Sequence, residues 1–165
     1  MSDAYIQLDG IKGQASDDAH KDWIEIIAYD QTLELPIQNA QAGSGGREAV
    51  GRVQCGDLVI TKQMCIASPD LAFHCASGKP ISKAELHLVA AAGTKRIVYL
   101  KVTLTEVFIS KYVVAMKDPK TNRPTEDVSL NYGTIKWEYT KIDEKGGAGS
   151  PFIKGWNRTA NKEAS

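Results

Sequence analysis

The sequence has no excess charge of either sign and no long apolar run. Lysine plus arginine and aspartate plus glutamate each number 20 among 165 residues, so the formal net charge is zero. The chain therefore lacks the strong positive field that binding to nucleic acid or to an anionic membrane usually needs. Its apolar stretches are far shorter than the roughly 20 residues that cross a bilayer. We expect no nucleic-acid partner and no membrane insertion.

The chain also lacks an export signal and paired cysteines. The first ten residues contain no basic segment followed by an apolar run, so we expect no cleaved signal peptide. Cys55, Cys65 and Cys75 are odd in number and form no Cys-x-x-Cys pair. These features predict a protein made in the cytoplasm with reduced thiols. The length and the apolar content of 42% predict a single domain over residues 1–165.

Short alternating and β-branched segments recur along the chain and predict antiparallel β-structure. They span residues 4–8, 23–29, 53–61, 84–90, 97–109 and 128–139. In the last segment the apolar residues move from even to odd positions around Gly133, which predicts a β-bulge there. Bent strands in a small chain favour closure. The predicted fold is mainly β, an antiparallel β-barrel of two sheets with one short α-helix and a long extended loop.

The helix is predicted over residues 68–78. Ser68 is a suitable N-cap, proline follows it, and Gly78 can end the helix in a left-handed conformation. Leu71, Ala72 and Cys75 are expected to form its buried stripe.

The extended loop is predicted over residues 36–52. It is rich in glycine and polar residues, and it is longer than most connections in compact domains, where loops beyond roughly 12–15 residues tend to be functional or disordered. We expect this loop to reach a surface outside its own domain.

Candidate metal-binding and catalytic residues lack the partners that such sites need. Asp17, Asp18, His20 and Asp22 cluster within six residues, but they have neither the glycine turn of a calcium loop nor the paired imidazoles of a zinc centre. The adjacent His74 and Cys75 would point about 100° apart on a helix, and His87 has no partner nearby in the sequence. We expect no catalytic residues, no cofactor and no metal site.

Several motifs occur in one order along nearly the whole chain, and together they resemble the haemolysin-coregulated protein (Hcp) family of bacterial type VI secretion. The motifs are residues 11–14 (IKGQ), 53–62 (VQCGDLVITK), 68–71 (SPDL), 75–79 (CASGK), 99–107 (YLKVTLTEV), 126–132 (EDVSLNY) and 155–157 (GWN).

This resemblance implies a structural subunit rather than an enzyme. Six copies would close into a ring, and rings would stack into a hollow tube that a contractile sheath expels. The implied partners are other copies of the chain, the sheath proteins, the spike protein that caps the tube, and small effectors carried in the lumen. The protein would be made in the bacterial cytoplasm and then secreted.

Within this picture the extended loop supplies the candidate contacts between subunits or rings, and strand parity places two further residues on the lumen or solvent face. The candidate contacts are Pro36, Gly43, Gly45, Gly46 and Arg47, and the candidate lumen or solvent residues are Asp30 and Thr32. The alternative is a barrel that binds a small molecule or catalyses a reaction, with Trp23, Trp137 and tyrosine residues lining a cavity.

Overall fold

The structure is a computed structural model that describes residues 3–39, 46–116, 119–120 and 122–165. It is mainly antiparallel β-structure with one short helix, as predicted. The strands are β1 (Asp3–Leu8), β2 (Ile24–Glu25), β3 (Ala28–Asp30), β4 (Leu33–Glu34), β5 (Ile37–Asn39), β6 (Arg47–Ala49), β7 (Gln54–Cys55), β8 (Leu58–Gln63), β9 (Ile81–Ala92), β10 (Lys95–Ala115), β11 (Thr125–Asn131), β12 (Thr134–Ile142), β13 (Ala148–Asn157) and β14 (Lys162–Glu163), and the helix is α1 (Ser68–Ser77).

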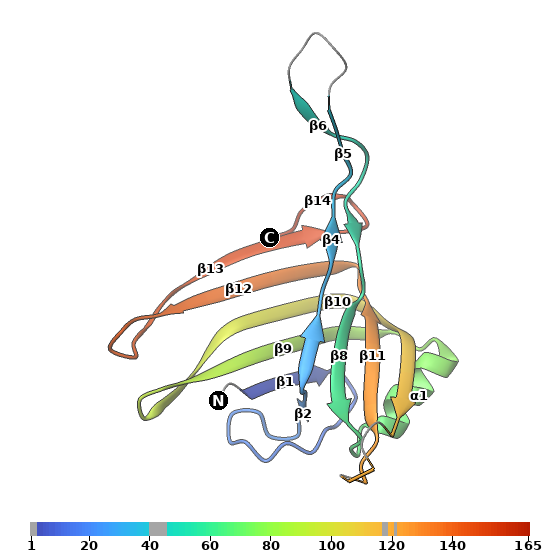
Figure 1. The fold of residues 1–165 in the computed structure, drawn as a ribbon, viewed down its shortest axis with the longest axis vertical. Coiled ribbons are helices and arrows are strands. Elements are labelled where there is room, and N and C mark those ends of the chain that lie inside the picture. Colours follow the sequence, from blue (N-terminus) through green and yellow to red (C-terminus); the bar gives the residue numbers. More distant parts are fainter. Residues whose placement is uncertain (1–2, 40–45, 117–118, 121) are drawn as a thin grey trace.

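The long strand β10 organises the large sheet, because its two halves pair with different strands (Figure 1). The N-terminal half lies between β9 and β12, and the C-terminal half pairs with β11. From there the sheet continues through β9 to β1 and β2, through β12 to β13 and β14, and through β11 to β8 and β3. The result is a strongly bent antiparallel sheet.

The strand ladders of the described residues do not close into the barrel that the sequence predicted. Two of the three edge strands of the sheet are β2 and β3, which are consecutive parts of one short segment, and the third is β14. The amide of Ile26 donates to Ala4 O at 3.0 Å, whereas the next amide, of Ile27, donates to Thr61 O at 2.7 Å. This segment changes partner between two adjacent residues, so it joins these two edges as a connection and not as a continuous paired strand.

The main core lies inside the bend of the sheet. It consists of fully buried aliphatic side chains from both halves of the sheet and from the helix, among them Ile6, Ile24, Leu58, Ile60, Leu71, Leu86, Leu104, Val107, Val128 and Leu130. A second, smaller cluster of Tyr5, Ala15 and Val89, with Trp23 packed against it, lies on the other side of β1 and β9. No helix in the described part of the chain is long and apolar enough to cross a bilayer.

The predicted β-bulge at Gly133 is instead a break between β11 and β12. A side chain at this position would collide with Glu106, since an added Cβ would lie 2.1 Å from Glu106 Oε2. Glu106 itself has a left-handed φ of 53°, and the buried residues of β10 change from Val102 and Leu104 to odd positions beyond it. The change of parity therefore marks a corner at which two neighbouring strands turn together.

The predicted helix is present, but its N-cap and its buried face differ from the prediction. The N-cap is Ala67, which makes no side-chain capping bond, while Ser68 is buried inside the first turn. The fully buried residues of α1 are Ser68, Leu71 and His74, whereas Ala72 and Cys75 are only partly buried, with Cys75 packed against the main core. The helix ends at Gly78 in the left-handed conformation, with φ of 66°.

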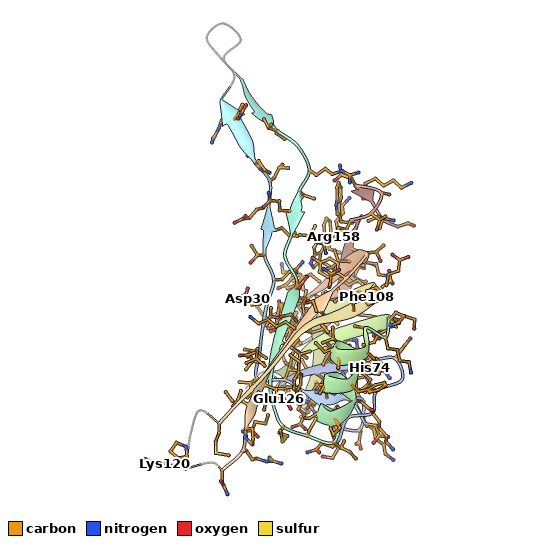
Figure 2. The ribbon with its side chains drawn as sticks, turned by 90° about the vertical axis from the view of Figure 1, so that its right-hand side faces the viewer. Asp30, His74, Phe108, Lys120, Glu126 and Arg158 are labelled. Carbon is orange, nitrogen blue, oxygen red and sulfur yellow. The ribbon has the colours of Figure 1, made fainter. Side chains whose placement is uncertain are left out.

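Ser68 is not a cap because it belongs to a buried polar cluster. The fully buried Lys62 donates to Glu126 Oε2 and, at 3.2 Å, to Ser68 Oγ. Ser68 Oγ donates to Glu126 at 2.9 Å, and Tyr112 donates to the other oxygen of that carboxylate. Burial raises the pKa of Glu126, but the hydrogen bonds from Lys62, Tyr112 and Ser68 outweigh burial and lower it overall. This cluster fixes the start of α1 to β8 and β11, and Glu126 is labelled in Figure 2.

Candidate functional site

The predicted extended loop forms a two-stranded arm that projects from the sheet (Figure 1). At its base β4 pairs with β7, and further out β5 pairs with β6. The amide of Val50 donates to Pro36 O at 2.8 Å between these two ladders, and Gly51 takes a left-handed φ of 88° there. The arm runs from Leu33 to Cys55, and residues 40–45 lie outside the described part of the chain.

The arm carries large apolar side chains in solvent. Leu33, Leu35, Ile37 and Val50 are each 42–55% exposed. Leu33, Leu35 and Ile37 occupy alternate positions, so in extended backbone they point to the same side. A two-stranded ribbon has no second layer to cover such a row. We call these four residues the apolar stripe of the arm.

The predicted contact residues fall on this arm. Pro36, Gly46 and Arg47 are exposed, whereas Gly43 and Gly45 lie outside the described residues. The predicted set does not include the apolar stripe. The sequence signal for the apolar stripe was the alternation of Leu33, Leu35 and Ile37. This signal was missed because the many glycines of the segment indicated a loop.

Asp30 and Thr32 are both exposed, near the point where the arm leaves the sheet (Figure 2). Asp30 pairs with Val59 of β8, and the next outward-facing row contains Thr61, whose hydroxyl donates to Asp127 at 2.8 Å. Thr32 O accepts the amide of Gly56 at 2.8 Å. The outer face of β3, β8 and β11 is thus largely polar, on the side of the sheet away from α1.

A second exposed apolar area lies on β12 and β13. Tyr139 and Phe152 are cross-strand partners with exposures of 53% and 71%, and Ile153 follows Phe152 along β13. Phe108, on the C-terminal half of β10, is also exposed. The adjacent exposed side chains of Tyr139 and Phe152 are candidates for a contact with another protein.

An open hollow of about 450 Å³ lies between the base of the arm and β12–β13. Its apolar lining includes Leu33, Val53, Trp137 and Trp156. The indole of Trp137 donates to Gln31 Oε1 at 3.1 Å. The predicted pairing of Trp23 with Trp137 in one cavity is wrong, because Trp23 packs instead beside the small second cluster.

The candidate residues for chemistry are held in structural contacts. His74 Nδ1 bonds the carbonyl of Asp70 at 2.8 Å. The described residues contain no group of three histidine, cysteine, aspartate or glutamate side chains placed to hold a metal ion. His87 does have a partner, however, since its Nδ1 lies 2.9 Å from Nε2 of His20. These two residues are 67 positions apart, so spacing in the sequence could not reveal their contact.

Comparison with known proteins agrees with this architecture. The profile of the family described as "Type VI secretion system effector, Hcp" matches residues 5–139. The protein Hcp1 of Pseudomonas aeruginosa is 30% identical over 163 residues, which cover 98% of each chain. A solved type six secretion system protein superposes with a TM-score of 0.91 at 30% identity, over 99% of this chain and 100% of that one. Hcp1 of Salmonella typhimurium superposes with a TM-score of 0.77 at 29% identity, over 99% of each chain.

The resemblance found in the sequence is therefore confirmed along almost the entire chain, arm included. The protein belongs to the Hcp family, the secreted structural proteins of the type VI secretion system, which are not enzymes.

Proposed function

We propose that this chain is the subunit of a hollow secretion tube. Six copies close into a ring, rings stack into the tube, a contractile sheath expels the tube behind a spike protein, and small effectors travel in the lumen. In this scheme the protein is made in the bacterial cytoplasm and then secreted. The observation that carries the proposal is the apolar stripe of the arm, which projects from the sheet and leaves large apolar side chains in water.

The arm supplies a contact between copies that the chain cannot satisfy alone. Burying one leucine or isoleucine side chain contributes about 1.5–3 kcal/mol, so covering several of them on a neighbour is a substantial driving force. A surface of one copy that fits a different surface of the next copy gives a ring when the rotation closes, and a stack when rings repeat. The absence of net charge favours this packing, because identical charged copies would repel.

The polar outer face of β3, β8 and β11 suits the lumen wall. Asp30 and Thr32 lie there, with the Thr61–Asp127 pair beside them. A polar, hydrated wall would let a cargo slide without adhering to it. We assign Pro36, Gly43, Gly45, Gly46 and Arg47 to the contacts that the arm makes with a neighbouring copy.

The arm contact is tested by placing charge on the apolar stripe. The double variant Leu35→Asp with Ile37→Asp should move the native mass from a multiple of the 18.0 kDa chain toward the single chain. Its circular dichroism and melting temperature as a monomer should stay close to wild type, because these side chains are exposed and lie outside the core. Gln38→Asp is the matched control, since Gln38 is exposed on the opposite side of the same strand. An unchanged native mass in the double variant would remove the arm from the assembly.

The hollow at the base of the arm favours a second candidate function, the binding of a small apolar molecule. Its volume and its two tryptophans fit such a ligand. A compound that co-purifies with the protein at one per chain, and is lost in Trp137→Ala, would support this function. A hollow that becomes filled by a neighbouring copy in the assembled ring would contradict it.

A further inference from the structure

A line of three hydrogen bonds ties the loop after β1 to strand β9. Asp17 Oδ2 lies 2.7 Å from His20 Nδ1, His20 Nε2 lies 2.9 Å from His87 Nδ1, and His87 Nε2 lies 2.8 Å from Glu85 Oε1. His20 is only 2% exposed. We call these four residues the histidine chain.

Both ends of the histidine chain are ionised carboxylates, which can only accept hydrogen bonds. Burial raises the pKa of Glu85, but hydrogen bonds from Lys83, His87 and Lys101 outweigh it and lower that pKa to about 2. At the other end, the hydrogen bond from His20 is the main cause that lowers the pKa of Asp17, and Arg96 acts in the same direction. The ring nitrogens that face these carboxylates must therefore both carry a proton.

The three contacts fix the number of protons that the imidazole rings of His20 and His87 must carry together. Each of the three contacts needs one proton, so the four ring nitrogens of His20 and His87 need three protons between them. Two neutral imidazoles carry only two protons, and two imidazolium ions carry four. All three contacts are satisfied only when one ring is charged and the other is neutral.

We propose that His20 and His87 share three ring protons at neutral pH, and that this one extra proton holds the loop of residues 12–23 on β1 and β9. Two arrangements satisfy every contact, because either ring can carry the extra proton. In the one that we propose, His20 donates from both nitrogens, to Asp17 and to His87, and His87 donates only from Nε2, to Glu85. Burial, the largest influence on His87, lowers its pKa and so favours the neutral form of that ring.

The surrounding aromatic side chains hold the two rings in place. Tyr5 stacks on His20 with 4.5 Å between ring centroids and an interplanar angle of 6°. Trp23 packs against both imidazoles, at 4.8 Å from His20 and 4.6 Å from His87. Neither imidazole can turn to another partner without disturbing this packing, so a missing or surplus proton is not easily accommodated.

Charged groups of both signs surround the histidine chain. Arg96 of β10 contacts Asp17 and Asp3 and also donates to the hydroxyl of Tyr5. On the other side, Lys83 and Lys101 contact Glu85. Glu138 of β12 lies 3.9 Å from Lys101 and from Lys136.

The loop depends on this tether because it contains no strand of its own. The backbone bonds from Gly13 N to Asp22 O at 2.7 Å and from Ala15 N to Trp23 O at 2.9 Å join residues within the loop, so they do not attach it to β1 or β9. Besides the histidine chain, Arg96 of β10 contacts Asp17, and Ala15 packs with Tyr5 and Val89. In acid a fourth proton would set two N–H groups against each other, and in base the loss of a proton would leave one contact unmade. We therefore expect the loop to be held most firmly at intermediate pH and to open more often on both sides.

The proton count can be read directly by nuclear magnetic resonance of the full chain with nitrogen-15 in its histidines. Around neutral pH the nitrogen shifts should show three protonated and one unprotonated nitrogen for His20 and His87 together. Two separate steps should follow on titration, one toward acid and one toward base. His74, which bonds a backbone carbonyl, is the internal reference. Two neutral rings at neutral pH, or one ordinary step shared by both rings, would overturn the proposal.

Variants at the ends of the histidine chain test the charge and not only the packing. Asp17→Asn and Glu85→Gln each keep an acceptor oxygen but remove a negative charge. The extra proton should then be lost at a lower pH, by roughly one pH unit, and amide exchange at Ala15 and Asp22 should rise about tenfold at neutral pH. His74→Gln should leave both readings unchanged. A purely structural role predicts an unaltered titration in the end variants and would contradict the proposal.

Discussion

At the scale of single residues, the strongest constraint is the buried pair of Lys62 and Glu126. Both side chains have no solvent exposure, and every oxygen of the carboxylate is satisfied by Lys62, Ser68 or Tyr112. A buried pair of this kind gains little over an apolar pair, but removing one partner leaves an uncompensated charge. Its role is to join β8, β11 and the start of α1 in one arrangement.

Removing one partner of this pair should therefore be costly. We expect Lys62→Met to lower the free energy of unfolding by about 3–5 kcal/mol, measured by urea denaturation. The double variant Lys62→Met with Glu126→Leu should recover a large part of the loss. Lys154→Met, which breaks the exposed pair with Glu163, should cost less than about 1 kcal/mol. A double variant as unstable as the single variant would contradict this account.

A carboxylate of the histidine chain makes the stability depend on pH. The pKa of Glu85 falls from 4.5 to about 2 on folding, so its contribution is present above pH 4.5 and is lost as the pH drops toward 2. The melting temperature of wild type should fall over this range, and Glu85→Gln should flatten that part of the curve while lowering stability at pH 7. A variant with the same acid slope as wild type would show that Glu85 does not contribute.

Contacts between buried polar residues are the part of the structure that the sequence predicts least well. Lys62 shares the parity of Leu58 and Ile60, and Glu126 shares that of Val128, so both lie on the core face of their strands. A polar residue at such a position is a signal for a buried partner, but the partner is 64 residues away. The contact of His20 with His87 was invisible for the same reason.

At the scale of elements, local sequence features predicted the type and position of the helix and of the main strands well. They did not predict whether the sheet closes into a barrel. The helix and the hairpin of β9 and β10 follow from Pro69, Gly78 and Gly93, whose conformations are local. The arm was expected as a loop because its glycines outweighed three alternating apolar residues. The strand ladders do not form a closed barrel, because the segment that contains Ile26 and Ile27 changes its partner from β1 to β8 between these two residues.

The end of α1 offers a direct test at this scale. Gly78 has φ of 66°, and the space that a Cβ would occupy there is open, so only its backbone conformation resists substitution. Gly78→Ala should lower the free energy of unfolding by about 1 kcal/mol. Gly78→Asn should lose less, because asparagine tolerates the left-handed region. Equal losses in thermal melts of the two variants would contradict a conformational cause.

At the scale of the whole molecule, the chain joins a well-filled core to surfaces that a monomer leaves uncovered. The arm that carries the apolar stripe projects away from the sheet, whereas Tyr139 and Phe152 are partners on β12 and β13 (Figure 1). Two distinct adhesive surfaces on one subunit are what a ring and a stack require. Composition and strand pattern predicted only a neutral β protein. The number of copies in an assembly depends on angles between subunits, which a sequence pattern does not contain. The assembly was therefore predicted only from the resemblance of the colinear motifs to a known family.

Electron microscopy of the purified full-length chain tests the central claim most directly, since self-contact is the whole of the proposed function. We expect closed rings of six copies with an open centre, with some rings stacked end to end at high protein concentration. Particles the size of one chain at every concentration, with no rings, would contradict it.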